Sequence, residues 1–163
     1  IGRIGQATAK MALGLGMKVI AADSFIDKVD VKVEFFDGQS VTTTIVSQSL
    51  ESLFKEADFI SLHVPAQNGY IISKAELAIM KDGVGIVNCA RGGVIDEIAL
   101  IDALDSGKVG FAGLDVFESE PKPEIKILMH PKISLTPHIG AATGEAQDRI
   151  GTELAQQIIS ILG

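Results

Sequence analysis

The residues of this sequence best suited to proton transfer are His138, in the segment Thr-Pro-His-Ile-Gly, and Glu120, which directly precedes Pro121. An imidazole that titrates near neutral pH can take the proton of a hydroxyl group while a hydride leaves the same carbon. A carboxylate hydrogen-bonded to that imidazole would fix its tautomer and stabilise its protonated form. Taken singly, His138 is more typical of a strand-end histidine bonded to backbone, and Glu120 of a solvated loop acid. Whether the two act together depends on the elements that position them.

A second candidate is Arg91, in the segment Asn-Cys-Ala-Arg-Gly-Gly. A guanidinium group offers a planar fork of donors that binds a carboxylate through two hydrogen bonds and so orients a small acid. Arginines more often form surface salt bridges, but here an apolar stretch precedes Arg91, and Gly92 and Gly93 follow it. This arrangement favours a tight, concave site. Cys89 has no visible acidifying partner in the sequence, so we expect a packed thiol rather than a nucleophile.

The first residues, Ile-Gly-Arg-Ile-Gly, have the spacing of the last two glycines of G-x-G-x-x-G, with Gly2 second and Gly5 third. In that fingerprint the pyrophosphate of a dinucleotide lies on backbone N–H groups at a helix N-terminus, here those of Arg3 and Ile4. A tight turn before any helix can contain the same residues, so the glycines alone are weak evidence. We expect the first glycine, and the strand before it, to precede Ile1 in a longer protein.

Asp23 strengthens the dinucleotide interpretation. It lies about 20 residues beyond the glycines, at the end of the next predicted strand. A carboxylate there can accept hydrogen bonds from the ribose hydroxyls of adenosine, and it would repel a 2′-phosphate. The neighbouring Ser24 is not the arginine that such a phosphate would favour. The sequence therefore predicts NAD rather than NADP as the cofactor.

Composition restricts the class of protein. The chain has 163 residues, 47% of them hydrophobic and 21% charged, which is enough for one domain with a sizeable core. No apolar run approaches the length of a membrane helix, and a net charge of −7 without a basic stripe disfavours nucleic acid and anionic membrane surfaces. A single cysteine excludes an internal disulfide, and no set of residues has metal-ligand spacing. We expect a cytoplasmic protein without a metal site.

Apolar strand-like runs alternate with stretches of helical periodicity, which is the βαβ pattern of a parallel sheet. We expect a single α/β domain over residues 1–163, with a Rossmann-type doubly wound parallel sheet that lacks its first strand. Residues 31–36 and 41–46 flank Asp37-Gly38 and predict an added β-hairpin. The other expected strands are 18–22, 59–62, 85–88, 111–114 and 133–136. The expected helices are 4–15, 49–55, 74–80, a helix from Asp96 to before Gly107, and a long amphipathic helix from Gly144 onward.

The carboxyl ends of parallel strands meet at one edge of the sheet, where ligands of open α/β folds bind. Five of the expected strands are followed by a polar residue, namely Asp23, His63, Arg91, Asp115 and His138. One such residue would mean little, because polar residues must follow strands somewhere. Five of them would converge on one crevice, so we interpret this edge as the ligand site.

Together these motifs resemble the D-isomer-specific 2-hydroxyacid dehydrogenase family. In chain order the resemblance rests on Gly2-Arg3-Ile4-Gly5, Asp23, His63-Val64-Pro65, Cys89-Ala90-Arg91-Gly92-Gly93, Asp115-Val116-Phe117, Glu120-Pro121 and Thr136-Pro137-His138-Ile139-Gly140-Ala141. It spans nearly the whole chain with the motifs in the family's order. The resemblance implies an NAD-dependent oxidoreductase that transfers a hydride between a D-2-hydroxy acid and NAD.

The resemblance also implies roles for single residues. Arg91 would bind the substrate carboxylate, His138 would be the acid and base, and Glu120 would be its partner. Glu120 is preferred to Glu118 because it directly precedes Pro121, as in the family pattern. The residues implied to contact NAD are Gly2, Arg3, Ile4, Gly5, Asp23, His63, Val64, Pro65, Cys89, Ala90, Arg91, Asp115, His138, Gly140 and Ala141. Of these, Asp115 and the backbone near positions 89, 140 and 141 would hold the nicotinamide end.

The sequence departs from the family pattern in three ways. The first glycine with its strand is missing, and the substrate domain, which the family builds from sequence on both sides of this domain, is missing too. In addition, many members have a shorter helical connection where residues 31–46 predict a hairpin. Residues that select the substrate's variable end would come largely from the missing domain. The expected partner is therefore a small 2-hydroxy or 2-oxo acid, without a unique choice among them.

Within the family, residues 141–151 most resemble the members that oxidise D-3-phosphoglycerate in the first step of serine biosynthesis, ahead of those acting on lactate or glycerate. Relatives pair through this domain, which implies a homodimer. Two other functions stay open from the sequence. One is an NAD-sensing scaffold, similar to the corepressors that share this fold and bind peptides. The other is a sulfate- or nucleotide-binding module without chemistry.

Overall fold

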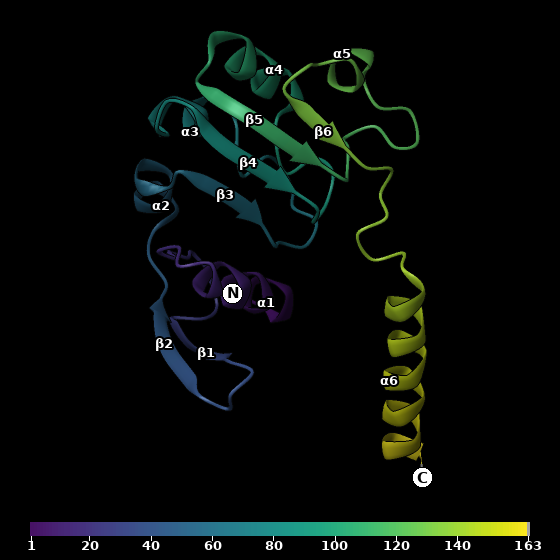
Figure 1. Ribbon diagram of the computed structural model, residues 1–163. Helices are drawn as coiled ribbons and strands as arrows, with labels where there is room; N and C mark the ends of the chain where they lie inside the picture. The colour runs from purple at the N-terminus through teal and green to yellow at the C-terminus, as the bar shows by residue number, and fades with distance from the viewer. Residues whose placement is uncertain (163) are drawn as a thin grey trace.

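A four-stranded parallel sheet forms the centre of the larger part of the chain, in a computed structural model that describes residues 1–162 (Figure 1). Its strands, in spatial order, are β3 (Phe59–Leu62), β4 (Val84–Asn88), β5 (Val109–Leu114) and β6 (Ile133–Leu135). Each neighbouring pair is parallel. The four carboxyl ends therefore lie at one edge of the sheet, and the predicted α/β fold of Rossmann type is confirmed.

Four helices accompany these strands, and three of them begin at a capping side chain. They are α2 (Leu50–Glu56), α3 (Lys74–Ile79), α4 (Glu97–Ser106) and the short α5 (Ile125–Leu128), which was not predicted. The side chains of Ser49, Ser73 and Asp96 accept hydrogen bonds from backbone N–H groups in the first turns of α2, α3 and α4. Gly107 ends α4 in the left-handed conformation at φ 80°. These local signals explain why the predicted and observed helix limits agree closely.

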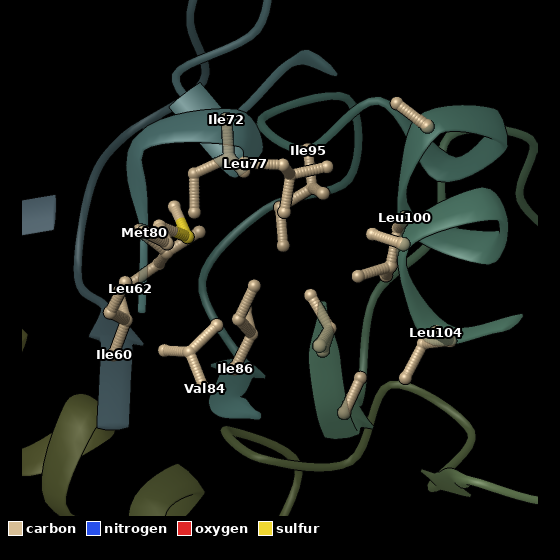
Figure 2. Close-up of a cluster of buried hydrophobic side chains, with 14 of the residues drawn as sticks. Ile60, Leu62, Ile72, Leu77, Met80, Val84, Ile86, Ile95, Leu100 and Leu104 are labelled. Atoms are coloured by element: carbon tan, nitrogen blue, oxygen red, sulfur yellow. The ribbon is translucent and has the colours of Figure 1, made fainter. Parts of the chain in front are cut away.

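The main hydrophobic core lies between the sheet and helices α3 and α4. Figure 2 shows side chains of β3 and β4, such as Ile60 and Ile86, together with Leu77 of α3 and Leu100 of α4. Ile86 and Leu100 are fully buried. Strand β4 is buried along most of its length, as expected for a central strand covered on both faces. This packing gives a rigid base for the loops that follow β4, β5 and β6.

The amino-terminal part of the chain forms a smaller unit from one helix and one hairpin. Helix α1 (Arg3–Gly14) packs on strand β1 (Lys28–Glu34), which pairs antiparallel with β2 (Ser40–Val46). Ala9, Val31 and Ile45 form its small buried core. The hairpin is therefore confirmed, with strands that begin earlier than expected. Gly38 has φ 85° in the turn, a conformation that explains the Asp-Gly signal.

The strand expected at residues 18–22 does not form. Within this segment only Ala21 makes a β-bridge, a single parallel one to Ser47. A strand is held by a row of hydrogen bonds to a neighbour, and among residues 1–162 no strand runs beside this segment. Its apolar composition was correctly recognised, but the prediction of a regular strand was wrong because pairing is not a local property.

Helix α6 (Gly144–Leu162) is the amphipathic helix expected at the end of the chain, and it stands apart from the sheet in Figure 1. None of its described residues is buried. Its Glu153 carboxylate lies 3.2 Å from the Arg3 guanidinium, so one exposed ion pair links α6 to the start of α1. No helix within residues 1–162, α6 included, combines the length and hydropathy needed to cross a membrane.

Candidate active site

His138 and Glu120 lie together on the loops that follow β6 and β5. Their Nδ1 and Oε2 atoms are 2.7 Å apart, and both side chains are partly exposed. The other carboxylate oxygen of Glu120 accepts a hydrogen bond from the N–H of Phe117, at 3.0 Å. The hydrogen bond with His138 and then the one from Phe117 lower the pKa of Glu120 from its ordinary value. An ionised Glu120 fixes the proton on Nδ1, so Nε2 is the ring atom that can accept a proton.

The backbone of His138 adopts a left-handed conformation, with φ 57°. A residue other than glycine held there costs about 1–3 kcal/mol and persists only where its surroundings fix it. Asp115 fixes the His138 backbone by bonding residues that precede and follow it in the chain. It accepts hydrogen bonds from the Ile139 and Gly140 N–H groups, at 2.9 and 2.8 Å, and from the Thr136 hydroxyl, at 2.5 Å. The imidazole is therefore presented by a constrained loop.

Asp115 itself is only 2% exposed. Burial alone would raise the pKa of its carboxyl, but the hydrogen bonds from Thr136, Ile139 and Gly140 outweigh burial, and the pKa lies below its ordinary value. Asp115 is expected to contact the nicotinamide end of NAD, and its hydrogen bonds to Ile139 and Gly140 also hold the loop after β6 in place. A side chain at position 140 would meet the Asp115 carboxylate at 2.9 Å, so the close approach of this loop requires Gly140.

Arg91 lies on the loop after β4, which a buried amide holds in place. Asn88 is 3% exposed; its Oδ1 accepts from the Ala90 N–H at 3.0 Å, and its Nδ2 donates to the Arg91 carbonyl at 2.9 Å. Sequence reasoning did not assign Asn88 a role, although it directly precedes the Cys-Ala-Arg motif. The Arg91 side chain is exposed and bonds only the neighbouring Ala90 carbonyl, and no carboxylate of residues 1–162 pairs with it. The fork of donors is therefore open to an incoming carboxylate.

Cys89 does not match the expectation of a packed thiol, because the structure leaves it exposed. Partial burial and the nearby negative charge of Asp115 nevertheless raise the pKa of its thiol. A neutral thiol is a poor nucleophile. The prediction of burial was wrong, while the expectation that Cys89 is not an activated nucleophile agrees with its surroundings.

The first turn of α1 presents open backbone donors. Gly2 is the residue before the helix, and no side chain of residues 1–162 caps the helix there. A Cβ atom at Gly2 would meet nothing within 4 Å. The Arg3 side chain turns to Glu153 instead. The N–H groups of Arg3 and Ile4 therefore lie in the first turn of a helix that no described side chain caps, and such a helix N-terminus suits the negative charge of a pyrophosphate.

Asp23 lies beside this turn, although the strand expected before it is absent. Its carboxylate lies beside the backbone nitrogen of Ile1 and accepts hydrogen bonds from the N–H groups of Phe25 and Ile26, at 2.8 and 3.1 Å. Ser47 bonds the Asp23 backbone on both sides, donating to its carbonyl and accepting from its N–H. The carboxylate is thus placed next to the start of α1, as a ribose-binding acid requires.

His63 follows β3 directly and completes the contact between the two parts of the chain. A Cβ atom at Gly5 would lie 3.7 Å from the His63 side chain, an ordinary van der Waals distance. Burial lowers the pKa of His63. A neutral, half-buried imidazole is consistent with packing rather than proton transfer. The next two residues differ, since Val64 is half-buried against the core and Pro65 is exposed.

The remaining predicted positions are Ala90, which is partly buried against the core, and Ala141, which is exposed on the loop before α6. Within residues 1–162, no group of three or more histidine, cysteine, aspartate or glutamate side chains is arranged to hold a metal ion. The structure thus places the catalytic candidates on loops at the carboxyl edge of the sheet. The dinucleotide candidates divide between these loops and the part of the chain beside α1 and β3.

Comparison with known proteins decides the family. Residues 1–140 match the NAD-binding domain of the D-isomer-specific 2-hydroxyacid dehydrogenases. This chain belongs to that family. The hydroxypyruvate reductase of Thermotoga maritima is 50% identical to it over 99% of the chain and 51% of that protein. The D-3-phosphoglycerate dehydrogenase of Methanocaldococcus jannaschii is 43% identical over 99% of the chain and 30% of that protein.

Solved structures of the family confirm the fold. The D-lactate dehydrogenase of Aquifex aeolicus, solved with NAD and lactic acid, has a TM-score of 0.76 at 34% identity, over 99% of this chain and 51% of that one. A glyoxylate reductase from Paecilomyes thermophila has a TM-score of 0.77 at 39% identity, over 93% of this chain and 44% of that one. The chain therefore spans about half the length of these relatives, or less.

The described residues fit the cofactor of the family. The uncapped start of α1 suits a pyrophosphate, and Asp23 beside it suits a ribose. The acidic Asp23 and the exposed Ser24 beside it match NAD better than NADP. The chain is thus an NAD-binding domain of this family, as the sequence predicted.

Proposed function

We propose that the protein is an NAD-dependent oxidoreductase that converts a D-2-hydroxy acid to the 2-oxo acid, with Arg91, Glu120 and His138 as its catalytic residues. The observation that carries this proposal is the 2.7 Å contact between His138 Nδ1 and Glu120 Oε2, which leaves Nε2 available as a base. The open guanidinium of Arg91 on the neighbouring loop supplies the site for the acid's carboxylate.

Each residue has a defined part in the reaction. Arg91 binds the substrate carboxylate through two hydrogen bonds and so turns the adjacent carbon toward the cofactor. Nε2 of His138 takes the hydroxyl proton as the C–H bond of that carbon breaks, and the carbon becomes a carbonyl. Glu120 stabilises the imidazolium that forms. NAD, when bound, supplies the ring that accepts the hydride. In the reverse direction the same imidazolium returns its proton to the carbonyl oxygen.

For the substrate we propose D-3-phosphoglycerate, and with it the first step of serine biosynthesis. Relatives named D-3-phosphoglycerate dehydrogenase, from Methanocaldococcus jannaschii and Synechocystis, are 43% and 40% identical over 99% of the chain and support this choice. A second candidate is the pair D-glycerate and hydroxypyruvate, favoured by the 50% identity to the Thermotoga maritima hydroxypyruvate reductase. The two candidates share a three-carbon acid and differ by a phosphate group.

The test of this proposal is NADH formation by the full-length protein with NAD and a panel of acids. The panel contains D-3-phosphoglycerate, D-glycerate, D-lactate, 2-hydroxyglutarate and the L-enantiomers as controls. We expect the highest kcat/KM for D-3-phosphoglycerate. A preference for D-glycerate would retain the mechanism and replace the substrate. Saturable NAD binding without turnover of any acid would contradict the enzymatic proposal.

The same proposal includes a cytoplasmic homodimer, which rests on the resemblance to relatives that pair through this domain. Sedimentation of the full-length protein at micromolar concentration would test it. A mass twice that of one chain is expected, and a monomer at every concentration would contradict it.

A further inference from the structure

Glu97 and Glu118 form a reciprocal pair that the proposed mechanism does not use. The Glu97 carboxylate accepts a hydrogen bond from the N–H of Glu118 at 2.8 Å, and the Glu118 carboxylate accepts one from the N–H of Glu97 at 3.0 Å. The Tyr70 hydroxyl donates to the second oxygen of Glu118, at 3.3 Å. Two segments that are distant in sequence, the start of α4 and the loop after β5, are thereby joined at one point.

The pair is costly to place here. Glu97 is 6% exposed, and no lysine or arginine of residues 1–162 forms an ion pair with either carboxylate. Burial raises the pKa of Glu97, and the backbone N–H of Glu118 offsets only part of this effect. A buried acid without a cation is expensive unless hydrogen bonds compensate it. Apolar residues would stabilise the contact more simply, so stability alone does not account for the pair.

The position of the pair suggests what it does. Glu118 lies between Phe117, whose N–H bonds the Glu120 carboxylate, and Glu120 itself. Gly92 of the Arg91 loop also packs against this segment, so closely that a Cβ atom there would overlap the Phe117 carbonyl. The segment from Phe117 to Glu120 is therefore held between the Arg91 loop and the start of α4.

We infer that Glu97 and Glu118 are positioning residues, whose reciprocal hydrogen bonds fix the segment 117–120 and so set Glu120 and His138 relative to Arg91. This inference rests on the proposed function. Proton transfer and carboxylate binding must act on the same small molecule, and a displacement of about 1 Å can lower a rate about 100-fold. Neither glutamate contacts the reacting atoms in this account, and both act through Glu120.

The test compares Glu118→Ala with Glu118→Gln in the full-length protein. Alanine removes the acceptor for the Glu97 N–H, whereas the glutamine carbonyl retains it. We expect Glu118→Ala to lower kcat at least about tenfold while the Kd for NAD, measured by calorimetry, changes less than about twofold. Glu118→Gln should restore most of kcat. Glu97→Ala and Glu97→Gln repeat the test for the other hydrogen bond, in which the Glu97 carboxylate accepts from the Glu118 N–H.

A matched control is Glu124→Ala. Glu124 precedes α5, its negative charge acts on Glu97, and its side chain does not cap the helix. This variant removes a nearby charge without removing the reciprocal bonds, so its kcat should equal that of the wild type. Kinetics are measured at a temperature where circular dichroism shows every variant folded. If Glu118→Ala does not fold, the test uses the Glu97→Ala and Glu97→Gln variants instead. It also uses Tyr70→Phe, which removes only the hydrogen bond from the Tyr70 hydroxyl to Glu118.

The outcomes separate this inference from the proposed function. If wild-type protein is active and His138→Ala is inactive, but folded Glu118→Ala and Glu97→Ala have wild-type kcat and KM, the positioning role is wrong and the function stands. A failure of glutamine to rescue kcat would also overturn the role of the acceptor atoms. If His138→Ala and Arg91→Ala are as active as the wild type, the proposed function itself fails.

Discussion

The two ends of the candidate crevice differ in whether side chains occupy their backbone hydrogen-bonding groups. At the catalytic end, the buried Asn88, Glu97 and Asp115 bind the chain's own backbone and hold three loops in place. At the dinucleotide end, the first turn of α1 has no capping side chain, and Gly2 leaves open space before it. One end is fixed before any ligand arrives, and the other keeps its donors available for one.

This difference has a physical reason. Proton transfer depends on distances within a few tenths of an ångström, so the groups that perform it must be oriented in advance. Phosphate binding is more tolerant, because a helix N-terminus offers several N–H groups and a diffuse positive potential. Variants at the catalytic end should therefore change kcat or stability, while those at the dinucleotide end should change the affinity for NAD.

The largest effect is expected for His138→Ala and Arg91→Ala. Loss of the base, or of the carboxylate-binding fork, should lower kcat/KM for the acid about 10²–10⁴-fold. The Kd for NAD should stay close to that of the wild type, because the pyrophosphate and ribose groups lie elsewhere. Stopped-flow and steady-state measurements of NADH formation, with calorimetry for NAD, check both statements. Near-normal turnover by either variant would remove the distinction between the two ends.

Asp115→Asn should have the next largest effect, on stability as well as on rate. Asparagine keeps one acceptor oxygen but places an amide nitrogen, which cannot accept, where the other oxygen was. It therefore cannot accept from both the Ile139 and the Gly140 N–H groups, and the free energy of unfolding should fall by about 2 kcal/mol. His138 should then leave its left-handed conformation, and kcat should drop. Urea denaturation and activity assays measure the two changes. An unchanged urea midpoint would mean that Asp115 does not hold this loop.

The stability difference between wild type and Asp115→Asn should also depend on pH. Because folding lowers the pKa of Asp115, its ionised carboxylate stabilises the fold above the ordinary aspartate value of about 3.9. This contribution is lost as the pH falls through that value toward the lower pKa of the folded state. The difference between the two proteins should be constant near neutrality and shrink below about pH 4. A difference that grows in acid would contradict the assigned direction.

Asp23→Ala tests the other end. It should raise the Kd for NAD about tenfold or more, since hydrogen bonds to a charged group are worth about 1.5–3 kcal/mol each. It should also reduce the preference for NAD over NADP, because the repulsive carboxylate is gone. At saturating NAD, kcat should remain near the wild-type value. Calorimetry with both dinucleotides provides the measurement, and an unchanged preference would exclude Asp23 from ribose recognition.

The smallest effect is expected for Gly5→Ala. An added Cβ atom would lie 3.7 Å from the His63 side chain, which is an ordinary contact rather than an overlap. Helix α1 would gain from alanine's higher helix propensity, so the melting temperature should be equal or slightly higher. Thermal denaturation followed by circular dichroism measures it. A large loss of stability would show that α1 packs more tightly against β3 than the structure indicates.

Much of this architecture was predictable from local sequence signals. Asp96 and Gly107 mark the limits of α4, and Asp37-Gly38 marks the hairpin turn, because capping and turn conformations depend on a few neighbouring residues. The carboxyl edge of the sheet was predictable from polar residues that follow apolar strands, such as His63 and Asp115. These signals are enough to indicate the catalytic candidates in the sequence.

What the sequence could not supply was pairing between distant segments. Residues 18–22 have a strand-like composition but form only one bridge, since a strand also needs a neighbour. The bonds from Asp115 to the loop of Gly140, and those between Glu97 and Glu118, join residues more than 20 positions apart. The exposure of Cys89 likewise depends on how three loops meet. Such features depend on tertiary contacts that no short motif encodes.

The most direct test of the central claim follows the hydride itself. The full-length protein is given NAD and D-3-phosphoglycerate, or D-glycerate, that carries deuterium on the carbon bearing the hydroxyl, and the NADH formed is analysed by NMR. We predict deuterium on the nicotinamide ring with the D-enantiomer, none with the L-enantiomer, and almost no labelled NADH from His138→Ala. Labelled NADH formed by His138→Ala at the wild-type rate, or no labelled NADH from the wild type, would contradict the account.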